Sequence, residues 1–147
     1  DLYQEIILDH YRRPRNARPL RGIAALREHE NPVCGDSMRL LAVPDPQGRL
    51  GEIAFDGKGC AISIASASMM TALVKGKPIE EVRGLIGSFL RVLRGEDPPG
   101  ALDRLGDLAS LKGVIQYPIR VKCATLAWHA LEEALEGSGG TDGGGRR

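Results

Sequence analysis

Hydrophobic side chains recur at regular spacings along most of the 147-residue chain. The first such pattern has the i, i+3, i+4, i+7 spacing of an amphipathic helix and consists of Tyr3, Ile6, Ile7 and His10. It predicts a helix over residues 2–11, which Pro14 should end because proline cannot continue a helix. Residues 14–35 contain prolines and arginines with little periodicity, so they are expected to form mostly loop.

Two short runs then predict a β-hairpin. Met38, Leu40 and Ala42 stand at alternate positions, as on one face of a strand. A turn is expected at residues 44–48, Pro-Asp-Pro-Gln-Gly, because prolines and glycine interrupt regular structure there. Residues 50–55 supply the returning strand.

Helical patterns dominate the second half of the chain. Helices are predicted over residues 61–75, 78–93 and 119–135, with a loop over 96–106 and one short helical turn over 107–111. Residues 1–136 are expected to form a single domain, and the glycine-rich residues 137–147 a flexible tail. The predicted fold class is α+β: a small antiparallel β-sheet with helices packed on one face.

Charge and composition argue against two classes of function, nucleic-acid binding and membrane spanning. The net charge of +1 gives no general argument for nucleic-acid binding, and no aromatic residues interleave the N-terminal arginines. The longest uncharged stretch, residues 59–74, is serine-rich and shorter than the roughly 18 apolar residues of a membrane span. No export signal is visible, and the cysteine count is odd, so a cytoplasmic location is expected.

Candidate chemistry centres on three cysteines, Cys34, Cys60 and Cys123, all expected at the ends of structural elements. Asp36 follows the first by two residues, and Arg120 and Lys122 stand just before the last. Helix N-termini and nearby cations favour the thiolate, which is both a metal ligand and a nucleophile. Three thiolates and one carboxylate suit zinc, and the two cations would offset their charge, while sulfur ligands also suit iron–sulfur clusters. Spacing alone leaves open that the cysteines are unrelated small hydrophobic residues.

The segments around the cysteines resemble a known family. They are Asn31-Pro32-Val33-Cys34-Gly35-Asp36, the run from Gly57 to Ser68, and the run from Pro118 to Trp128. Together with Asp9-His10-Tyr11-Arg12-Arg13-Pro14-Arg15-Asn16, they look like the motifs of the IscU/NifU N-terminal family of iron–sulfur cluster assembly proteins. Lys122 stands where IscU proteins carry histidine, and the segment between the second and third cysteines is longer, so the chain resembles the SufU-type branch. This resemblance implies a SufE/NifU-like fold.

The resemblance also implies a function. Cys34, Asp36, Cys60 and Cys123 would bind Zn²⁺, and Cys34 would accept persulfide sulfur from a PLP-dependent, SufS-like cysteine desulfurase. The alternative is a scaffold that assembles a transient [2Fe–2S] cluster on the same ligands for downstream iron–sulfur assembly proteins. A zinc hydrolase is disfavoured, because four protein ligands leave no position for water; at most, the chain would be a zinc-dependent sulfurtransferase.

The remaining candidates concern the partner and the histidines. The desulfurase would contact the first helix and the arginines after it, through His10, Arg12, Arg13 and Arg15. His29 lies in a polar stretch and is expected to be solvated, and His129 should point away from Cys123 on its helix. No histidine is expected to bind the metal.

Overall fold

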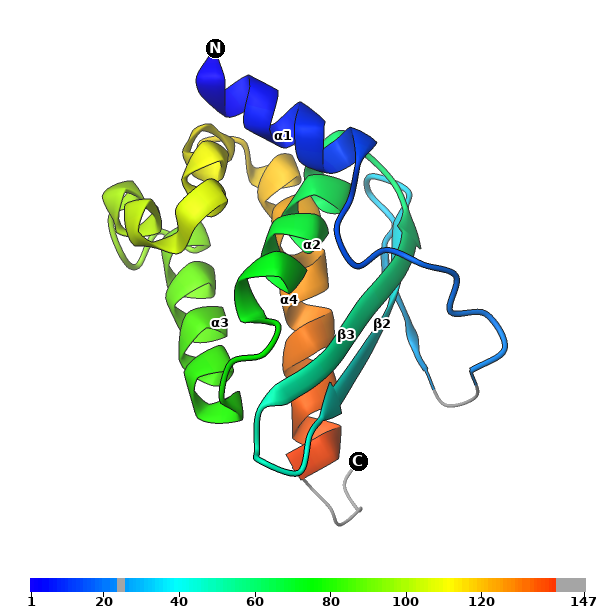
Figure 1. The fold of residues 1–147 in the computed structure, drawn as a ribbon. Coiled ribbons are helices and arrows are strands. Elements are labelled where there is room, and N and C mark those ends of the chain that lie inside the picture. The colour runs from blue at the N-terminus through cyan, green and yellow to red at the C-terminus, as the bar shows by residue number, and fades with distance from the viewer. Residues whose placement is uncertain (24–25, 140–147) are drawn as a thin grey trace.

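The computed structural model describes residues 1–23 and 26–139. The strands form a three-stranded antiparallel sheet of order β1–β2–β3. Figure 1 shows the sheet on one side of the molecule, with helices covering one of its faces. Helices α2 (Ala61–Val74) and α4 (Pro118–Gly139) pack against the sheet, and α3 (Ile79–Leu93) packs against α4. The predicted fold class is therefore confirmed.

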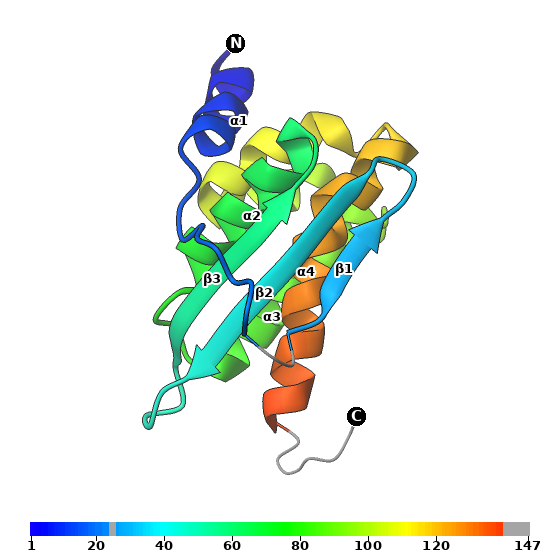
Figure 2. The same cartoon turned by 90° about the vertical axis from the view of Figure 1, so that its right-hand side faces the viewer.

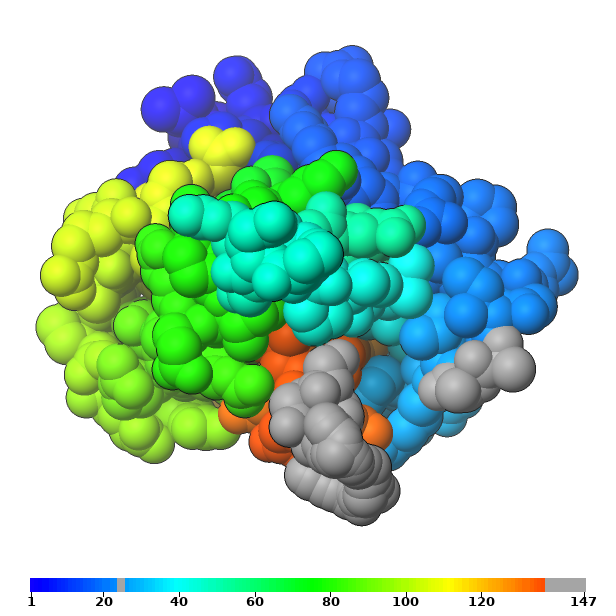
Figure 3. All heavy atoms as spheres, turned by 60° about the horizontal axis from the view of Figure 1, so that its bottom comes forward, coloured from blue at the N-terminus to red at the C-terminus, as the bar shows by residue number. Residues whose placement is uncertain are grey.

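The central hairpin has the predicted strands and turn. Strand β2 (Asp36–Pro44) pairs with β3 (Leu50–Lys58), and Met38 and Leu40 are buried on the helix-covered side. The turn end of the hairpin is tied to the segment joining α2 and α3, because the Gly76 N–H donates to the Leu50 carbonyl at 2.7 Å. Figure 3 shows these two segments in contact at that end of the molecule.

The first strand was not predicted. Strand β1 (Glu28–Asn31) lies within the region expected to be loop and pairs with β2, placing Asn31 opposite Asp36. Its sequence, Glu-His-Glu-Asn, contains no apolar residue. An edge strand tolerates such a sequence because it can be held by backbone hydrogen bonds to its neighbour and buries little side-chain surface. The strand therefore leaves no hydrophobic alternation in the sequence.

Helix α2 is buried on most of its surface, and its small polar side chains are satisfied internally. Ser66 Oγ donates to the Ala124 carbonyl at 2.7 Å and accepts from the Trp128 indole N–H at 3.1 Å. Trp128 in turn stacks on Phe89 of α3, with ring centroids 4.2 Å apart. These contacts lock α2, α3 and α4 into one core and fix the ends of α2 and α4 that carry cysteines.

Helix α1 (Leu2–Arg12) is anchored by a buried histidine. The His10 ring lies between two partners, with Nδ1 2.7 Å from Ser68 Oγ and Nε2 2.9 Å from Asp107 Oδ2. Figure 1 shows α1 lying across the end of the molecule where α2 and α4 begin. His10 therefore joins α1 to two other elements and is not part of the exposed surface.

The segment between α3 and α4 also differs from the prediction. It forms a nearly continuous 3₁₀-helical stretch, η1 (Pro99–Val114), interrupted by non-helical backbone at Leu105 and Gly106. Its buried apolar side chains recur every three residues: Leu102, Leu105, Leu108, Leu111 and Val114. Since a 3₁₀-helix has three residues per turn, side chains at this spacing lie on one face within each part of η1, and all five pack into the core.

The last helix is longer than predicted. Helix α4 extends to Gly139, so residues 137–139, predicted as the start of the tail, are helical, and residues 140–147 lie outside the described part.

The chain after α1 forms a parallel bridge from Ala17 to Phe55 of β3, and Leu20 is buried beyond it. Figure 2 shows this segment crossing the sheet face that the helices leave open. No helix within residues 1–23 and 26–139 combines the length and apolar character of a membrane span.

Candidate metal centre

A tight loop between β1 and β2 presents the first cysteine. The backbone N–H groups of Cys34 and Gly35 both donate to the Asn31 carbonyl, at 3.2 and 2.9 Å, and Gly35 adopts a φ of 73°. A side chain would strain the backbone at that φ, which explains the glycine. The loop leaves Cys34 half-buried and places Asp36, only 2% exposed, at the first position of β2.

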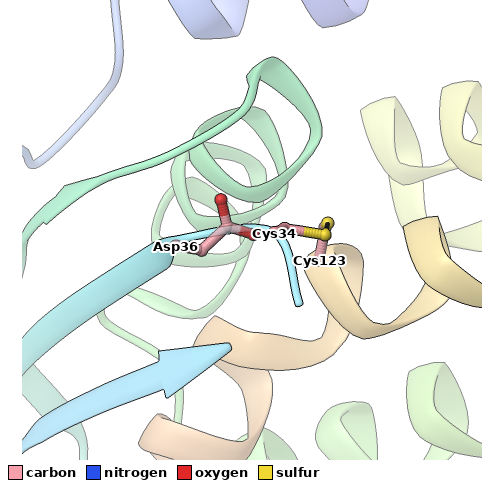
Figure 4. A group of neighbouring side chains, drawn as sticks. All are labelled: Cys34, Asp36 and Cys123. Carbon is pink, nitrogen blue, oxygen red and sulfur yellow. Dashed lines mark hydrogen bonds between the residues drawn. The ribbon is translucent and has the colours of Figure 1, made fainter. Parts of the chain in front are cut away.

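The last cysteine meets this loop from the opposite side. Cys123 lies in the second turn of α4 and is 2% exposed, and its Sγ is 2.8 Å from Cys34 Sγ. This distance exceeds the roughly 2.05 Å of a disulfide bond, and both thiols are free. One oxygen of Asp36 and the two sulfurs all lie within 4.8 Å of one another. Figure 4 shows the three side chains side by side. Residues 89 positions apart in the sequence thus form a group able to hold a metal ion.

The remaining predicted ligand lies at the edge of this trio. Cys60 is the N-cap residue of α2, and its backbone N–H donates to Asp36 Oδ1 at 2.9 Å. Its Sγ lies 4.0 Å from Asp36 Oδ2 and 3.9 Å from Ser63 Oγ. The Asp36 carboxylate therefore lies close to Cys60 as well as to the paired thiols. The structure brings three predicted ligands together and places the fourth beside the carboxylate.

The sequence predicted conditions that favour thiolates at the cysteines, but the surroundings of Cys123 favour its protonated thiol. Burial raises the pKa of the Cys123 thiol, and its neighbours Cys34, Asp36 and Cys60 raise that pKa further. The exposed side chains of Arg120 and Lys122 form none of the ion pairs or hydrogen bonds found in the described part of the chain. The guanidinium of Arg120 instead lies 5.6 Å from the centre of the Tyr117 ring. The buried donors consequently need a bound cation if they are to ionise together.

The predicted partner residues divide into buried and exposed groups. His10 is 3% exposed, with both ring nitrogens engaged, so its side chain cannot belong to a docking surface. Arg12 is exposed, whereas Arg13 and Arg15 both pair with Asp9 while remaining accessible. The arginines thus stay available to a partner.

The other two histidines lie outside the cysteine and aspartate group. The His29 side chain is 13% exposed, which corrects the expected solvation, and burial lowers its pKa. His29 Nε2 lies 3.6 Å from Glu133, and exposed His129 lies near Glu132. The metal-ligand group found among the described residues contains neither histidine.

Two polar residues at the centre received no role from the sequence. Asn31 is buried, and its side-chain Nδ2 lies 3.8 Å from Cys123 Sγ. Ser63 lies beside Cys60, and its hydroxyl donates to the Cys60 carbonyl at 3.0 Å. Both residues fall within the cysteine-containing motifs, but only the folded chain shows which atoms they contact.

Comparisons with known proteins agree with this arrangement. The model of the NifU-like N terminal domain matches residues 2–137, and the chain belongs to this family. The chain is 44% identical over 135 residues to the zinc-dependent sulfurtransferase SufU of Bacillus subtilis, covering 91% of this chain and 89% of that protein. It is 42% identical over 137 residues to the iron–sulfur cluster assembly scaffold protein IscU of Streptococcus pyogenes, covering 93% and 84%.

A solved structure shares the fold. The crystal structure of a hypothetical protein superposes with a TM-score of 0.79 at 41% sequence identity, covering 92% of this chain and 97% of that one. One of the two relatives is named a sulfurtransferase and the other a scaffold protein. Similarity alone therefore does not choose between these two roles, and the choice depends on the geometry of the cysteine and aspartate group.

Proposed function

We propose that the protein is a zinc-bound sulfur acceptor of iron–sulfur cluster assembly, which receives persulfide sulfur from a cysteine desulfurase on Cys34. The observation that carries the proposal is the asymmetry of the paired thiols. Cys34 is half-buried on a surface loop, whereas Cys123 is almost fully buried in a helix. A partner protein can reach the first thiol and not the second.

The donor set fits zinc. Cys34, Cys123, Cys60 and Asp36 would hold the ion, and three sulfurs with one oxygen match its usual four-ligand chemistry. A bound zinc supplies positive charge that stabilises the thiolates, which burial otherwise disfavours. The 44% identity to a protein described as zinc-dependent supports zinc over other metals.

The sulfur transfer itself is a thiol exchange. The Cys34 thiolate attacks the outer sulfur of the desulfurase persulfide, a new sulfur–sulfur bond forms on Cys34, and the sulfur–sulfur bond on the desulfurase breaks. The desulfurase cysteine leaves as thiolate, so the transfer needs no external oxidant or reductant. The carbonyl of Ile119, 4.0 Å from Cys34 Sγ, and the exposed Val33 flank the attacking sulfur.

The surface around Cys34 is suited to a protein partner. Val33, Tyr117 and Ile119 are all more than half exposed, although large apolar side chains are usually buried. Arg120 stands beside Tyr117 and adds a positive charge to this rim. A PLP-dependent, SufS-like desulfurase would dock here and extend toward Arg12, Arg13 and Arg15 at the end of α1 and just after it.

A second candidate function rests on the same donors. Three cysteines and an aspartate also suit a transient [2Fe–2S] cluster, and the 42% identity to a scaffold protein favours keeping this alternative. In that case, downstream assembly proteins would receive the cluster from this chain.

Metal analysis and a desulfurase assay separate the two. We expect one zinc per chain after anaerobic purification and faster cysteine turnover by a PLP-dependent desulfurase when the protein is added. A stoichiometric iron–sulfur cluster with little zinc, and no stimulation of the desulfurase, would favour the scaffold.

A further inference from the structure

Asn31 contacts the centre in two separate ways. Its backbone carbonyl accepts the N–H groups of Cys34 and Gly35 and so closes the loop that carries Cys34. Its side chain turns inward, is 6% exposed, and brings Nδ2 to 3.8 Å from the sulfur of Cys123. This distance is within the range of a hydrogen bond to sulfur.

The side-chain amide faces only one of the three sulfurs. Among the hydrogen bonds of residues 1–23 and 26–139, Cys34 Sγ contacts Cys123 and the Ile119 carbonyl, and Cys60 Sγ contacts Asp36 and Ser63. An N–H directed at a thiolate draws electron density from the sulfur, which lowers its reactivity and opposes its protonation. The two paired thiols therefore have different environments.

We infer that Asn31 is a positioning residue that holds Cys123 as the anchored ligand of the metal and leaves Cys34 as the ligand that is released to accept sulfur. The inference rests on the proposed sulfur-acceptor function and extends it by explaining which thiol reacts. Burial of Cys123 blocks access from outside, and the Asn31 amide makes its thiolate a poorer nucleophile. Cys34 carries neither constraint.

A measurement on the wild-type protein tests the contact directly. In a protein loaded with cadmium-113 and labelled with nitrogen-15, the hydrogen bond should transmit a scalar coupling from the metal through Cys123 Sγ to one side-chain amide proton of Asn31. The side-chain amide of Asn16, which donates to Thr71 Oγ1 at 3.1 Å, is the internal control and should show none. A spectrum without coupling at Asn31 overturns the inference, whatever the variants show.

Two variants then test the consequence. Asn31→Leu keeps a similar size and removes the donor, and Gln47→Leu makes a comparable change at an exposed position in the β2–β3 turn. Asn31→Leu should speed zinc release to a chelator by about 10-fold and shift sulfur–cobalt absorption of the cobalt-substituted protein to longer wavelength. Gln47→Leu should match the wild type in both measurements.

These experiments distinguish failure of the Asn31 inference from failure of the proposed sulfur-acceptor function. If wild-type protein accepts no sulfur but shows the cadmium coupling, the sulfur-acceptor proposal fails and the Asn31 contact stands as a property of the metal centre alone. If a folded Asn31→Leu protein releases zinc at the wild-type rate with an unchanged cobalt spectrum, Asn31 only fills space and the inference is wrong.

Discussion

Gly59 lies directly against the Asp36 carboxylate. A β-carbon at Gly59 would overlap Asp36 Oδ1 and stand 2.8 Å from Ser63 Oγ, and the residue has a φ of 155°. The close approach lets the next residue, Cys60, donate its N–H to the same carboxylate. Glycine at this position is therefore required by the local packing, since any side chain would displace the Asp36 carboxylate.

Gly59→Ala should consequently damage the centre more than the fold. We expect a loss of about 2 kcal/mol in the free energy of unfolding, from strain and displacement of Asp36, together with weakened zinc binding. Gly48→Ala is the control, because Gly48 has a φ of 78° and no atom within 4 Å of the added carbon. It should cost about 1 kcal/mol and leave zinc affinity unchanged. Urea unfolding and chelator competition give both quantities, and equal zinc affinity in the two variants would contradict this account.

Asp36→Ala should change the metal chemistry while keeping all three thiols. Removing the buried carboxylate leaves zinc with sulfur ligands and an open position, so we expect faster metal exchange. A transient iron–sulfur cluster should become longer lived on the remaining sulfurs. X-ray absorption should show three sulfurs at about 2.3 Å and one oxygen at about 2.0–2.2 Å in the wild-type zinc protein. An unchanged zinc spectrum in Asp36→Ala would show that Asp36 is not a ligand.

The arginines at the end of α1 and just after it are expected to contribute to desulfurase binding. Reversing Arg12, Arg13 and Arg15 to glutamate should weaken the complex and leave zinc in place, because none of the three contacts the cysteines. A control with the same charge change reverses exposed arginines on α3, after it and on η1: Arg83, Arg94 and Arg104. Calorimetric titration with the desulfurase compares the two triple variants, and equal affinities would reject a contact at Arg12, Arg13 and Arg15.

His29 should make stability depend on pH. Burial lowers its pKa in the folded protein from the usual 6.5, so the unfolded chain binds the proton more readily. Its contribution is fully present above pH 6.5 and is lost as the pH falls from that value toward the lowered folded pKa. His29→Gln should flatten the pH dependence of the unfolding free energy in this window. Exposed His129 is the comparison, and the same flattening in His129→Gln would assign the effect to general charge.

The sequence predicted those elements whose buried side chains follow the usual helix and strand periods. The hairpin, α2 and α3 were found in this way, because their apolar residues recur at two-residue or 3.6-residue spacing. Strand β1 was missed because its four residues are polar and its pairing comes from backbone groups. The 3₁₀-helix was predicted only in part, as one turn over residues 107–111, although its leucines recur every three residues, a spacing that neither the α-helix nor the strand pattern detects.

The candidate site was predictable to a similar extent. The cysteines and Asp36 stood out by residue type and motif, and the structure brings Cys34, Asp36 and Cys123 together with Cys60 at their edge. The role of Asn31 was not predictable, because it depends on a contact across 92 positions of sequence. His10 occupied a position of the apolar stripe of the first helix, so its burial was indicated by the same pattern that predicted the helix.

The central claim is that Cys34 receives the sulfur. The most direct measurement is mass spectrometry of the peptides after anaerobic incubation with a PLP-dependent desulfurase and cysteine. We predict a persulfide, one added sulfur atom, on Cys34 of the wild-type protein, and loss of sulfur acceptance in Cys34→Ala. A persulfide found mainly on Cys123 in both the wild type and Cys34→Ala would contradict the account.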